Sequence, residues 1–453
     1  MIESAVVVGG GISGLVAARR LALAGKKVTL LESSDRLGGL IRGVSLAGQT
    51  VDVGAEAFAV SRPDTLQLIT ELGLEDQLVS PQNSEARILS DGRFFKIPHG
   101  VLGIPSDLDD PALAEAIGAD AVAEAKRLDG QPWNQTEAGT VAELVITRLG
   151  QAVLDTLVTP VIAGVHSSDP SLLEINAVAP GLFALAAKLG SLTAAAAQLR
   201  ASAARPGAAV ASLRGGMHTL VEKLVSAIGD LGVEVRLNTP AAGTFKTPDG
   251  YQVLLQDGTR ISANYLVLAT PPRITAQILG SFPALATPLA LMRAVDVTVV
   301  ALVVTDHELD SAPVGSGVLV APSVHNIDAK ATTHATGKWE WLANEFGKGK
   351  HLVRLSYGRD GIVPAADDTL LATARADAQA LYGISADQIG EIVVQEWPGA
   401  MIQSRSGHLS LVNQILDAQK DFPNLALVGA GLGGNGITGI LAKSAAQYEQ
   451  IGL

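Results

Sequence analysis

The first forty residues alternate between apolar runs and glycines. The valines at residues 6–8 form a β-branched run typical of a strand buried on both faces, and this run stops at three consecutive glycines, residues 9–11. From Ile12 to Ala24 small and apolar residues recur at helical spacing, Gly25 ends that helix, and residues 27–31 have the pattern of a second strand. The pattern therefore predicts a strand, a glycine turn, a helix and a strand.

The pattern then changes to a loop and a long helical region. Asp91-Gly92 is a turn signal between two short strands. From Pro111 to about Leu199 alanine and leucine recur at helical spacing. We predict a helical insertion there, and an Ala/Pro/Gly linker over residues 201–210 follows it. The insertion should have breaks at Pro132, Pro160, Pro170 and Pro180.

Strand patterns return after the linker. A hairpin is predicted with Asp257-Gly258 at its turn. From about Thr287 to Trp397 apolar runs such as DVTVVALVV and HLVRLSYGR alternate with helical segments, which indicates a substrate domain built on an antiparallel sheet. The last stretch, residues 423–451, repeats the opening order of strand, glycine turn and helix. The cofactor domain is therefore assembled from separate pieces of the chain.

Composition narrows the class of protein. The chain of 453 residues has a net charge of −12 and no basic stretch, so we expect no nucleic-acid partner. It contains no cysteine, which excludes disulfides and thiolate metal sites and permits a reducing compartment. The eight histidines show no metal-ligand spacing, and we expect no metal site. Redox chemistry would have to come from a cofactor.

Hydropathy leaves the relation to membranes partly open. The mean hydropathy is +0.30, yet the most apolar helical stretch, GLFALAAKLGSLTAAAAQLR, is mostly alanine and falls short of a spanning helix. Peripheral contact through an amphipathic face is an open alternative. Met1 leads into a strand without a basic segment or cleavage site, so we expect no signal peptide and a cytoplasmic location.

The opening glycines fit the dinucleotide-binding pattern G-x-G-x-x-G in its required context. Gly9 makes the turn, Gly11 lets the backbone approach a pyrophosphate, and Gly14 lets helix and strand pack closely. The helix N-terminus favours phosphates, and Glu32 at the end of the second strand can accept hydrogen bonds from a ribose. The acid disfavours NADP, whose 2′-phosphate it would repel.

The continuation favours FAD over NAD as the cofactor. Arg36 followed by Gly38-Gly39 resembles the R-x-G-G extension of the amine-oxidase-like flavoproteins. A glycine pair gives a second backbone patch for a long cofactor, and Gly54 with Ala55 offers a close backbone approach after a third strand. We therefore expect a Rossmann-like FAD-binding domain in an α/β chain, α+β overall. The predicted divisions are residues 1–85, 206–286 and 398–453 for the FAD-binding domain, 86–205 for the substrate loop and helical insertion, and 287–397 for the substrate domain.

Several further stretches, in order along nearly the whole chain, resemble the protoporphyrinogen/coproporphyrinogen oxidase family, which are FAD enzymes of haem synthesis. They are GAEAFAVSRPDTLQLITELGL, KIPHGVLGIPSDL, LVTPVIAGVHSSDPSLLEINAVAP, LRGGMHTL, ATTHATGKW and GNGITGI. The resemblance implies dehydrogenation of a porphyrinogen to a porphyrin in three two-electron steps, with molecular oxygen as acceptor. It also leaves open contact with a downstream enzyme of the ferrochelatase type.

The soluble-looking chain and the bacterial style of these stretches favour coproporphyrinogen III as substrate. Protoporphyrinogen IX is the alternative within the family. A flavin amine oxidase shares the first forty residues, but it should carry a Tyr or Trp before the last glycine turn, and LALVGAGLGGNG has none. A non-catalytic protein that binds flavin and porphyrin is the third alternative.

Candidate site residues follow from the motifs and from the resemblance. The resemblance places Arg62 toward the substrate as a clamp for a propionate, against the alternative of a surface salt bridge. Lys338 and Lys96 are weaker candidates for the same role. Gly164 and His166 belong to a segment that faces the flavin in the family, and His166 is as readily structural. The cofactor-binding candidates are Gly9, Gly11, Ser13, Gly14, Glu32, Arg36, Gly38, Gly39, Gly54 and Ala55, joined through the resemblance by Ala241, Gly434, Gly436 and Ile437.

Overall fold

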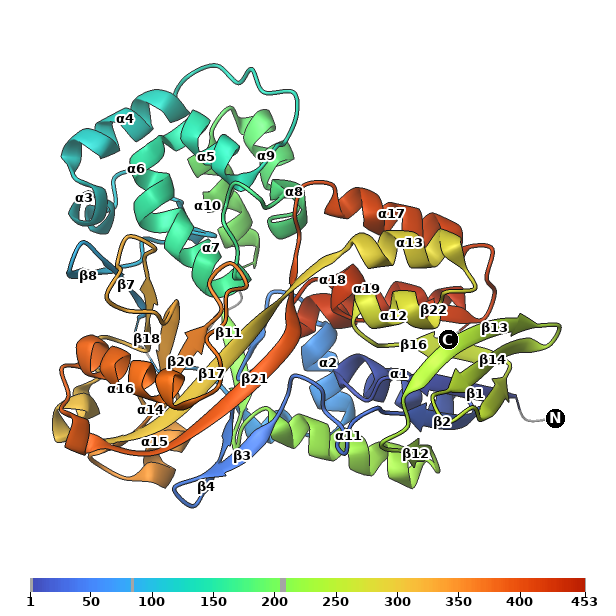
Figure 1. The fold of residues 1–453 in the computed structure, drawn as a ribbon. Coiled ribbons are helices and arrows are strands. Elements are labelled where there is room, and N and C mark those ends of the chain that lie inside the picture. Colours follow the sequence, from blue (N-terminus) through green and yellow to red (C-terminus); the bar gives the residue numbers. More distant parts are fainter. Residues whose placement is uncertain (1–2, 83–84, 204–208, 453) are drawn as a thin grey trace.

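Five parallel strands form a sheet in the order β12-β2-β1-β16-β22 in the computed structural model, which describes residues 3–82, 85–203 and 209–452 (Figure 1). Three distant parts of the chain supply these strands, which confirms the Rossmann-like assembly from discontinuous segments. The strands are β1 (Ser4–Val8), β2 (Lys27–Leu31), β12 (Glu234–Arg236), β16 (Tyr265–Leu268) and β22 (Leu425–Leu427).

Each face of the parallel sheet is covered by its own core. Val7 and Leu30 point to the core that contains α1 (Ile12–Leu23), α11 (His218–Asp230) and α19 (Ile437–Gln450). Val6 and Leu31 point to the opposite core. Burial on both faces explains why the predicted strands are continuous apolar runs rather than alternating ones. The second core packs β14 (Gly250–Leu255), α12 (Pro272–Ile278), α13 (Pro283–Leu291) and α17 (His408–Gln419).

A second sheet of seven strands, in the order β21-β17-β20-β19-β18-β7-β8, fills the lower left of Figure 1. Neighbouring strands pair antiparallel, with one correction to the predicted antiparallel sheet, since β18 and β7 pair parallel. Two of its strands precede the helical insertion in sequence. The strands are β7 (Arg87–Ser90), β8 (Arg93–Lys96), β17 (Arg293–Thr305), β18 (Gly317–Val320), β19 (Ala331–His334), β20 (Lys350–Tyr357) and β21 (Ile389–Gln403).

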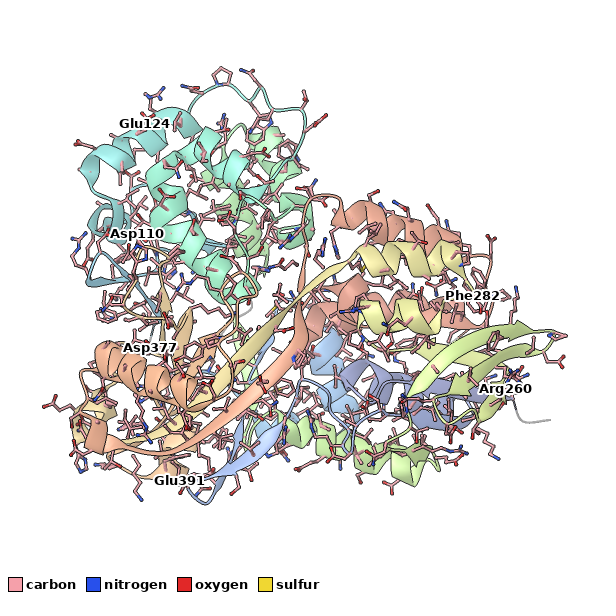
Figure 2. The ribbon with its side chains drawn as sticks, viewed as in Figure 1. Asp110, Glu124, Arg260, Phe282, Asp377 and Glu391 are labelled. Carbon is pink, nitrogen blue, oxygen red and sulfur yellow. The ribbon has the colours of Figure 1, made fainter. Side chains whose placement is uncertain are left out.

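Along the strands of this sheet, alternate side chains point to opposite faces and pack into two different hydrophobic cores. One face, with Val300 and Val353, packs on α16 (Asp368–Tyr382). Asp377 on α16, labelled in Figure 2, accepts hydrogen bonds from the Tyr357 hydroxyl and from the backbone N–H of Ala329, both at 2.9 Å. The other face packs against β3 (Gly43–Leu46), β4 (Gln49–Asp52), α14 (Ala335–Lys338) and α15 (Glu340–Phe346).

The helical insertion forms a separate layer at the upper left of Figure 1. Pro132, Pro170 and Pro180 lie between helices as predicted. The predicted break at Pro160 is wrong, because the chain is helical from residue 151 to 166 and widens into a π-helical turn at residues 154–158 just before the proline. The wider turn accommodates the ring of Pro160, whose nitrogen has no N–H to donate to the helix. The helices are α3 (Pro111–Ile117), α4 (Ala119–Asp129), α5 (Val141–Leu149), α6 (Gln151–Val153), α7 (Thr159–His166), α8 (Ile175–Val178), α9 (Leu182–Leu189) and α10 (Leu192–Ala203).

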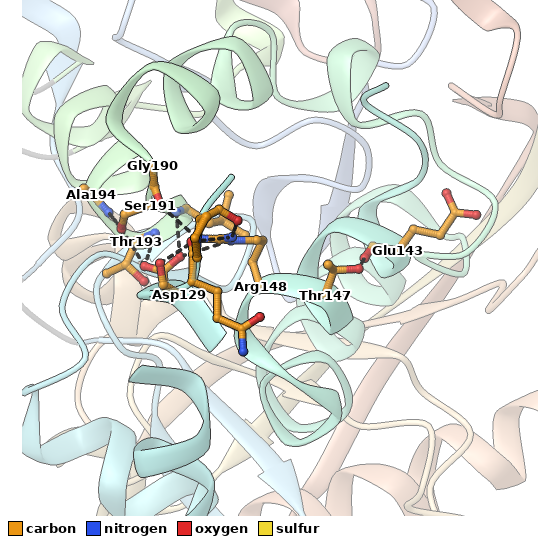
Figure 3. A network of polar contacts seen from close by, with 11 residues as sticks. Asp129, Glu143, Thr147, Arg148, Gly190, Ser191, Thr193 and Ala194 are labelled. Atoms are coloured by element: carbon orange, nitrogen blue, oxygen red, sulfur yellow. Dashed lines mark hydrogen bonds and ion pairs between the residues drawn. The ribbon is translucent and has the colours of Figure 1, made fainter. Parts of the chain in front are cut away.

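A buried ion pair links helices within this layer (Figure 3). Asp129 accepts hydrogen bonds from the Ser191 hydroxyl at 2.5 Å and from the Leu192 N–H at 2.7 Å, at the start of α10. Arg148 on α5 donates to the carbonyls of Asp129 at 2.6 Å and Gly190 at 2.8 Å. These contacts join α4, α5 and the turn between α9 and α10.

Both predicted hairpin turns are present. Asp91 and Gly92 have φ of 49° and 71°, the left-handed pair of a type I′ turn between β7 and β8. Gly258 has φ of 87° in the turn between β14 and β15 (Arg260–Ala263). Residues 204–208 of the predicted linker lie outside the described residues. No helix in the described part of the chain is both long and apolar enough to cross a bilayer.

Candidate active site

The first glycine turn lies at the carboxyl end of β1, between the strands that continue the sheet on either side. A Cβ on Gly14 would lie 1.7 Å from the Gly9 carbonyl oxygen, so only glycine allows this contact between helix and strand. A Cβ on Gly11 would meet nothing closer than the Gly39 Cα at 3.8 Å. Gly11 therefore keeps an open approach to its backbone, whereas Gly14 fixes the packing.

Glu32 is oriented by the turn that it faces. Its Oε2 accepts a hydrogen bond from the Gly10 N–H at 2.7 Å, and its Oε1 accepts one from the Ser34 N–H at 2.8 Å. The Thr239 N–H donates to the Glu32 carbonyl at 2.8 Å, which brings the start of β13 (Ala241–Thr247), and with it Ala241, beside the acid. The predicted ribose acceptor and the predicted adenine contact are therefore neighbours.

The second glycine pair joins the first turn. The Gly38 N–H donates to the Gly10 carbonyl at 2.8 Å, and Gly38 forms an isolated bridge with Gly11. Arg36 folds over this pair, donating to the Gly39 carbonyl at 2.8 Å, and its guanidinium lies 5.7 Å from the centre of the Trp397 ring. Burial and the nearby Arg42 lower the pKa of Arg36, which nevertheless stays protonated.

A third turn, between β22 and α19, completes the cradle. Ser13 lies beside it, because a Cβ on Gly429 would come within 3.8 Å of the Ser13 hydroxyl. Gly434 has φ of 78°, and Gly436 begins α19 at Ile437. Neither α1 nor α19 has a side-chain cap or an acidic residue in its first turn, so the N–H groups of both helices are available to a ligand.

These features together fit an adenine dinucleotide. An open backbone at Gly11, two uncapped helix N-termini and a fixed carboxylate are the donors and acceptors that a pyrophosphate and a ribose require. The parallel sheet places them outside the carboxyl ends of its strands, at the point where the strand order changes direction. The predicted cofactor-binding residues therefore lie in one connected region.

A buried charged cluster attaches this region to the seven-stranded sheet. Glu56, two residues after Gly54, pairs with Lys338 and with Arg354 of β20. Arg354 also donates to the Gly54 carbonyl at 2.6 Å. Burial by itself would raise the pKa of Glu56, but the charges of Lys338 and Arg354 lower it to about 2. Glu56 is therefore ionised, and Lys338 is held in an ion pair rather than directed to solvent.

A cavity of about 250 Å³ lies beside this cluster. Gly54 and Glu56 border it on the side of the cofactor region, and Gly164 of α7 borders it from the helical layer. Its lining mixes polar and apolar side chains. The sheet contributes Val299, Ala331, Thr332, Thr333, Arg354, Leu355 and Ser356. The structure thus brings together Gly54, a cofactor-binding candidate, and Gly164, from the segment that the resemblance places facing the flavin.

The end of β21 fixes two further segments of the site. Asn435, in the last glycine turn, accepts from the Ile402 N–H at 2.7 Å and donates to the Ile402 carbonyl at 2.8 Å. The next residue, Gln403, donates to the Ser167 carbonyl at 2.7 Å, at the C-terminus of α7. Strand β21 therefore holds the last glycine turn and the Gly164 segment in register with each other.

His166 lies beside a buried lysine. Burial and the charge of Lys330 lower the pKa of His166 to about 4. Lys330 is completely buried and bonds the Ser167 hydroxyl, and burial, followed by the charge of Arg359, lowers its pKa to about 8. His166 is therefore uncharged near neutral pH and contributes no positive charge toward a substrate carboxylate.

Arg62 and Lys96 lie at the surface, whereas Lys338 is largely buried. The Arg62 side chain is 61% exposed and its Nε lies 3.3 Å from Asp64, the contact that the salt-bridge alternative describes. The segment that carries Arg62 nevertheless lies near the last glycine turn. Thr65, three residues after Arg62, shares a hydrogen bond of 2.9 Å with Thr438, at the start of α19. Lys96 is exposed, pairs with Glu85, and borders another cavity.

That other cavity, of about 710 Å³, opens around Lys350 and His351 at the opposite end of β20. It is larger than the cavity beside Gly54, but apart from Lys96 it contains none of the residues that the sequence assigned to the site. We therefore locate the candidate active site at the smaller cavity, where the cofactor region, α7 and β20 meet.

Sequence reasoning missed the polar residues that connect the site. Arg354 carried a signal, since it is one charged residue inside the apolar strand pattern HLVRLSY. Lys330, Gln403 and Asn435 carried none, because their partners are far away in sequence.

Comparison with known proteins places this geometry in a family. A family model described as "Flavin containing amine oxidoreductase" matches residues 12–437. A coproporphyrinogen III oxidase of Mycobacterium leprae is 33% identical, with 99% of this chain and 98% of the relative covered. The human protoporphyrinogen oxidase is 30% identical over 71% of each chain. Among solved structures, a protein of Exiguobacterium has a TM-score of 0.86 at 24% identity, covering 99% of this chain and 98% of that one.

Proposed function

Since the chain belongs to the family of flavin-containing amine oxidoreductases and is an FAD-dependent oxidoreductase, we propose that it dehydrogenates coproporphyrinogen III to coproporphyrin III in haem synthesis. The relative that supports this substrate is matched over nearly its whole length, so the comparison extends to the substrate domain as well as the cofactor region. When bound, FAD supplies the redox chemistry by accepting a hydride in each of three two-electron steps.

One observation carries the proposal, namely that Gly54 and Gly164 border the same cavity. Both positions require glycine for close packing, because a Cβ on Gly54 would lie 1.9 Å from the Leu40 carbonyl oxygen and one on Gly164 would lie 2.5 Å from the Leu319 side chain. The cavity therefore lies where the backbones of these two segments approach the sheet most closely. At 250 Å³ the cavity lies just below the range of about 300–1,000 Å³ usual for ligand pockets. We therefore assign it to one side of the macrocycle rather than to the whole ring.

The residues of the chain itself hold the walls of the site in position and take no part in making or breaking bonds. Arg354 and Lys338 hold residues 54–56 against the sheet, while Asn435 and Gln403 hold the last glycine turn and α7 to the end of β21. Fixing these backbone segments before the substrate binds lowers the entropy lost in reaching the reactive arrangement. The apolar side chain of Val299 excludes water from one wall of the cavity.

The described residues that line the cavity include no aromatic ring. This disfavours the flavin amine oxidase alternative, which the sequence already disfavoured because an aromatic residue is missing before the last glycine turn. Protoporphyrinogen IX is the alternative substrate, and the human relative supports it. The two porphyrinogens differ in their number of carboxylates, so substrate choice depends on the charges around the cavity.

Anaerobic reduction of the protein-bound flavin, followed by its absorbance, tests the proposal directly. Coproporphyrinogen III should reduce the flavin faster than protoporphyrinogen IX, and an amine such as putrescine should not reduce it. Faster reduction by protoporphyrinogen IX would show that this porphyrinogen, rather than coproporphyrinogen III, is the substrate. Reduction by the amine alone would refute the porphyrinogen assignment. A protein that binds both porphyrins without flavin reduction would be the non-catalytic binding protein.

Molecular oxygen is the proposed electron acceptor. Mixing the reduced protein with aerated buffer should restore the oxidised flavin spectrum within one turnover time, and a much slower return would exclude oxygen as the acceptor. We also propose a cytoplasmic location, which the absence of cysteine permits. Contact with a membrane surface or with a ferrochelatase-type enzyme stays a prediction.

A further inference from the structure

The charges around the cavity do not balance. Lys338 and Arg354 each pair with Glu56, and among the described residues no second carboxylate lies within ion-pair distance of either cation. The cluster thus carries one positive charge in excess. Its side chains are largely buried, with 19%, 9% and 16% exposed for Lys338, Arg354 and Glu56. A buried charge without a partner is unfavourable unless a ligand compensates it.

Arg354 is the cation of this cluster that borders the cavity. Its Nη1 pairs with Glu56 and its Nη2 donates to the Gly54 carbonyl, but its buried Nε has no hydrogen-bond partner. A guanidinium presents its donors as a planar fork that matches a carboxylate. The side chain therefore has an unused donor, and the cluster to which it belongs has one positive charge in excess.

Strand register places Arg354 on the face of the sheet that borders the cavity. Thr333 lies opposite it on β19 and Ala301 lies opposite it on β17. Ser356, two residues further along β20, shares this face because side chains alternate along a strand. Arg354 is thus the charged side chain that the sheet contributes to the cavity, where Glu56 is the acidic one from the cofactor region.

We propose that Arg354 is a specificity-determining residue that binds one carboxylate of the substrate in this cavity. The inference rests on the proposed function, in which that carboxylate is a propionate of the porphyrinogen. The aliphatic side chain of Val299 would contact the adjoining pyrrole, and Thr333 and Ser356 offer hydroxyl groups to the carboxylate. This places the carboxylate beside Gly54, at the junction with the cofactor region.

The test is equilibrium binding of coproporphyrin III, the product, to the FAD-loaded protein, followed by porphyrin fluorescence. Arg354→Gln should raise the dissociation constant by about tenfold or more, because a charge-assisted bond is lost. Its kcat should change less than its KM, because the contact exists in both ground and transition states. Arg354→Lys should show a smaller loss of about several-fold, since an ammonium keeps the charge but not the fork.

Arg375→Gln is the matched control. Arg375 is a partly buried arginine on α16, on the opposite face of the same sheet, where its guanidinium approaches the Ile389 carbonyl at 3.4 Å. This variant loses the same charge away from the cavity, and its dissociation constant should stay within about twofold of the parent value. Melting temperature and FAD content, measured for each variant, show whether the site is intact.

The outcomes separate the two proposals. If the parent protein binds coproporphyrin III and Arg354→Gln binds it equally well, Arg354 is only a strut between β20 and residues 54–56, and the inference is wrong while the proposed function stands. If coproporphyrinogen III fails to reduce the flavin of the parent protein, the proposed function is wrong and the inference falls with it. Should Arg354→Gln fail to fold, Arg354→Lys decides, since unchanged porphyrin binding by that variant would overturn the inference.

Discussion

Glu32 accepts a hydrogen bond from the backbone N–H of Gly10 at 2.7 Å, so the predicted ribose acceptor is fixed to the glycine turn that would hold the pyrophosphate. The acid and the turn come from the ends of adjacent parallel strands, β2 and β1. One contact therefore sets the spacing between the predicted ribose and phosphate subsites.

Glu32→Ala should weaken FAD binding by about 1.5–3 kcal/mol, because the ribose loses a charged acceptor. Glu32→Gln should have a smaller effect, since it keeps an oxygen for Gly10. Calorimetric titration of the apoprotein with FAD measures both. Glu234→Ala, on the neighbouring strand β12, removes an acidic residue that pairs with Arg236 and should bind FAD as the parent does. Equal affinity of Glu32→Ala and the parent would remove Glu32 from the site.

Alanine substitutions at Gly14 and Gly11 should have opposite consequences. A Cβ at Gly14 would collide with the Gly9 carbonyl oxygen at 1.7 Å, so Gly14→Ala should lower the melting temperature of the apoprotein. A Cβ at Gly11 has space, with its nearest neighbour at 3.8 Å. Gly11→Ala should therefore leave the apoprotein stable but weaken FAD binding. If Gly11→Ala binds FAD normally, the pyrophosphate does not approach this backbone.

Two buried histidines should make stability depend on pH. His334 Nε2 lies 3.1 Å from His351 Nδ1, and the His351 Nε2 donates to the Asp306 carbonyl at 2.9 Å. Burial and the neighbouring His351 lower the pKa of His334 from 6.5 to about 4. Between these values the unfolded chain binds more protons than the folded one. Stability should therefore fall as pH falls from 6.5 toward 4, by at most about 1.4 kcal/mol per pH unit from this group.

Urea unfolding across that pH window measures the effect. His334→Gln should have a shallower dependence of unfolding free energy on pH than the parent, because it removes one group that the unfolded state protonates. His307→Gln is the control, since the His307 side chain is 81% exposed. An identical slope for His334→Gln and the parent would show that His334 binds protons equally in the folded and unfolded states, so that burial does not lower its pKa.

The ion pair of Asp129 and Arg148 should stabilise the helical layer. Their side chains are 6% and 4% exposed, and Arg148→Met would remove the positive charge that faces the buried Asp129 carboxylate and leave four backbone carbonyls without their donor. The expected loss is about 3–5 kcal/mol of unfolding free energy. Arg127→Met, which removes the exposed partner of Glu124 on α4, should leave the unfolding midpoint unchanged. Similar midpoints for the two variants would contradict this role.

The elements that the sequence predicted are those fixed by short stretches of chain. Lys27–Leu31 is a strand as predicted, and α1 covers Ile12–Leu23 within the predicted helix. The error at Pro160 arose because a proline signals a missing hydrogen bond but not whether a wider helical turn can absorb it. The parallel pairing of β18 with β7 was not predictable, because it joins segments on opposite sides of the helical insertion.

The sequence by itself determined the glycine turns, the fixed acid and the FAD-type fold, because these depend on local steric limits that only certain residues meet. The tertiary structure alone decided which polar groups meet. Arg354 reaches Glu56 across 298 residues, and Gln403 reaches Ser167 across 236. Such pairs depend on strand register and on the packing of one sheet against distant segments, which no short window of sequence specifies.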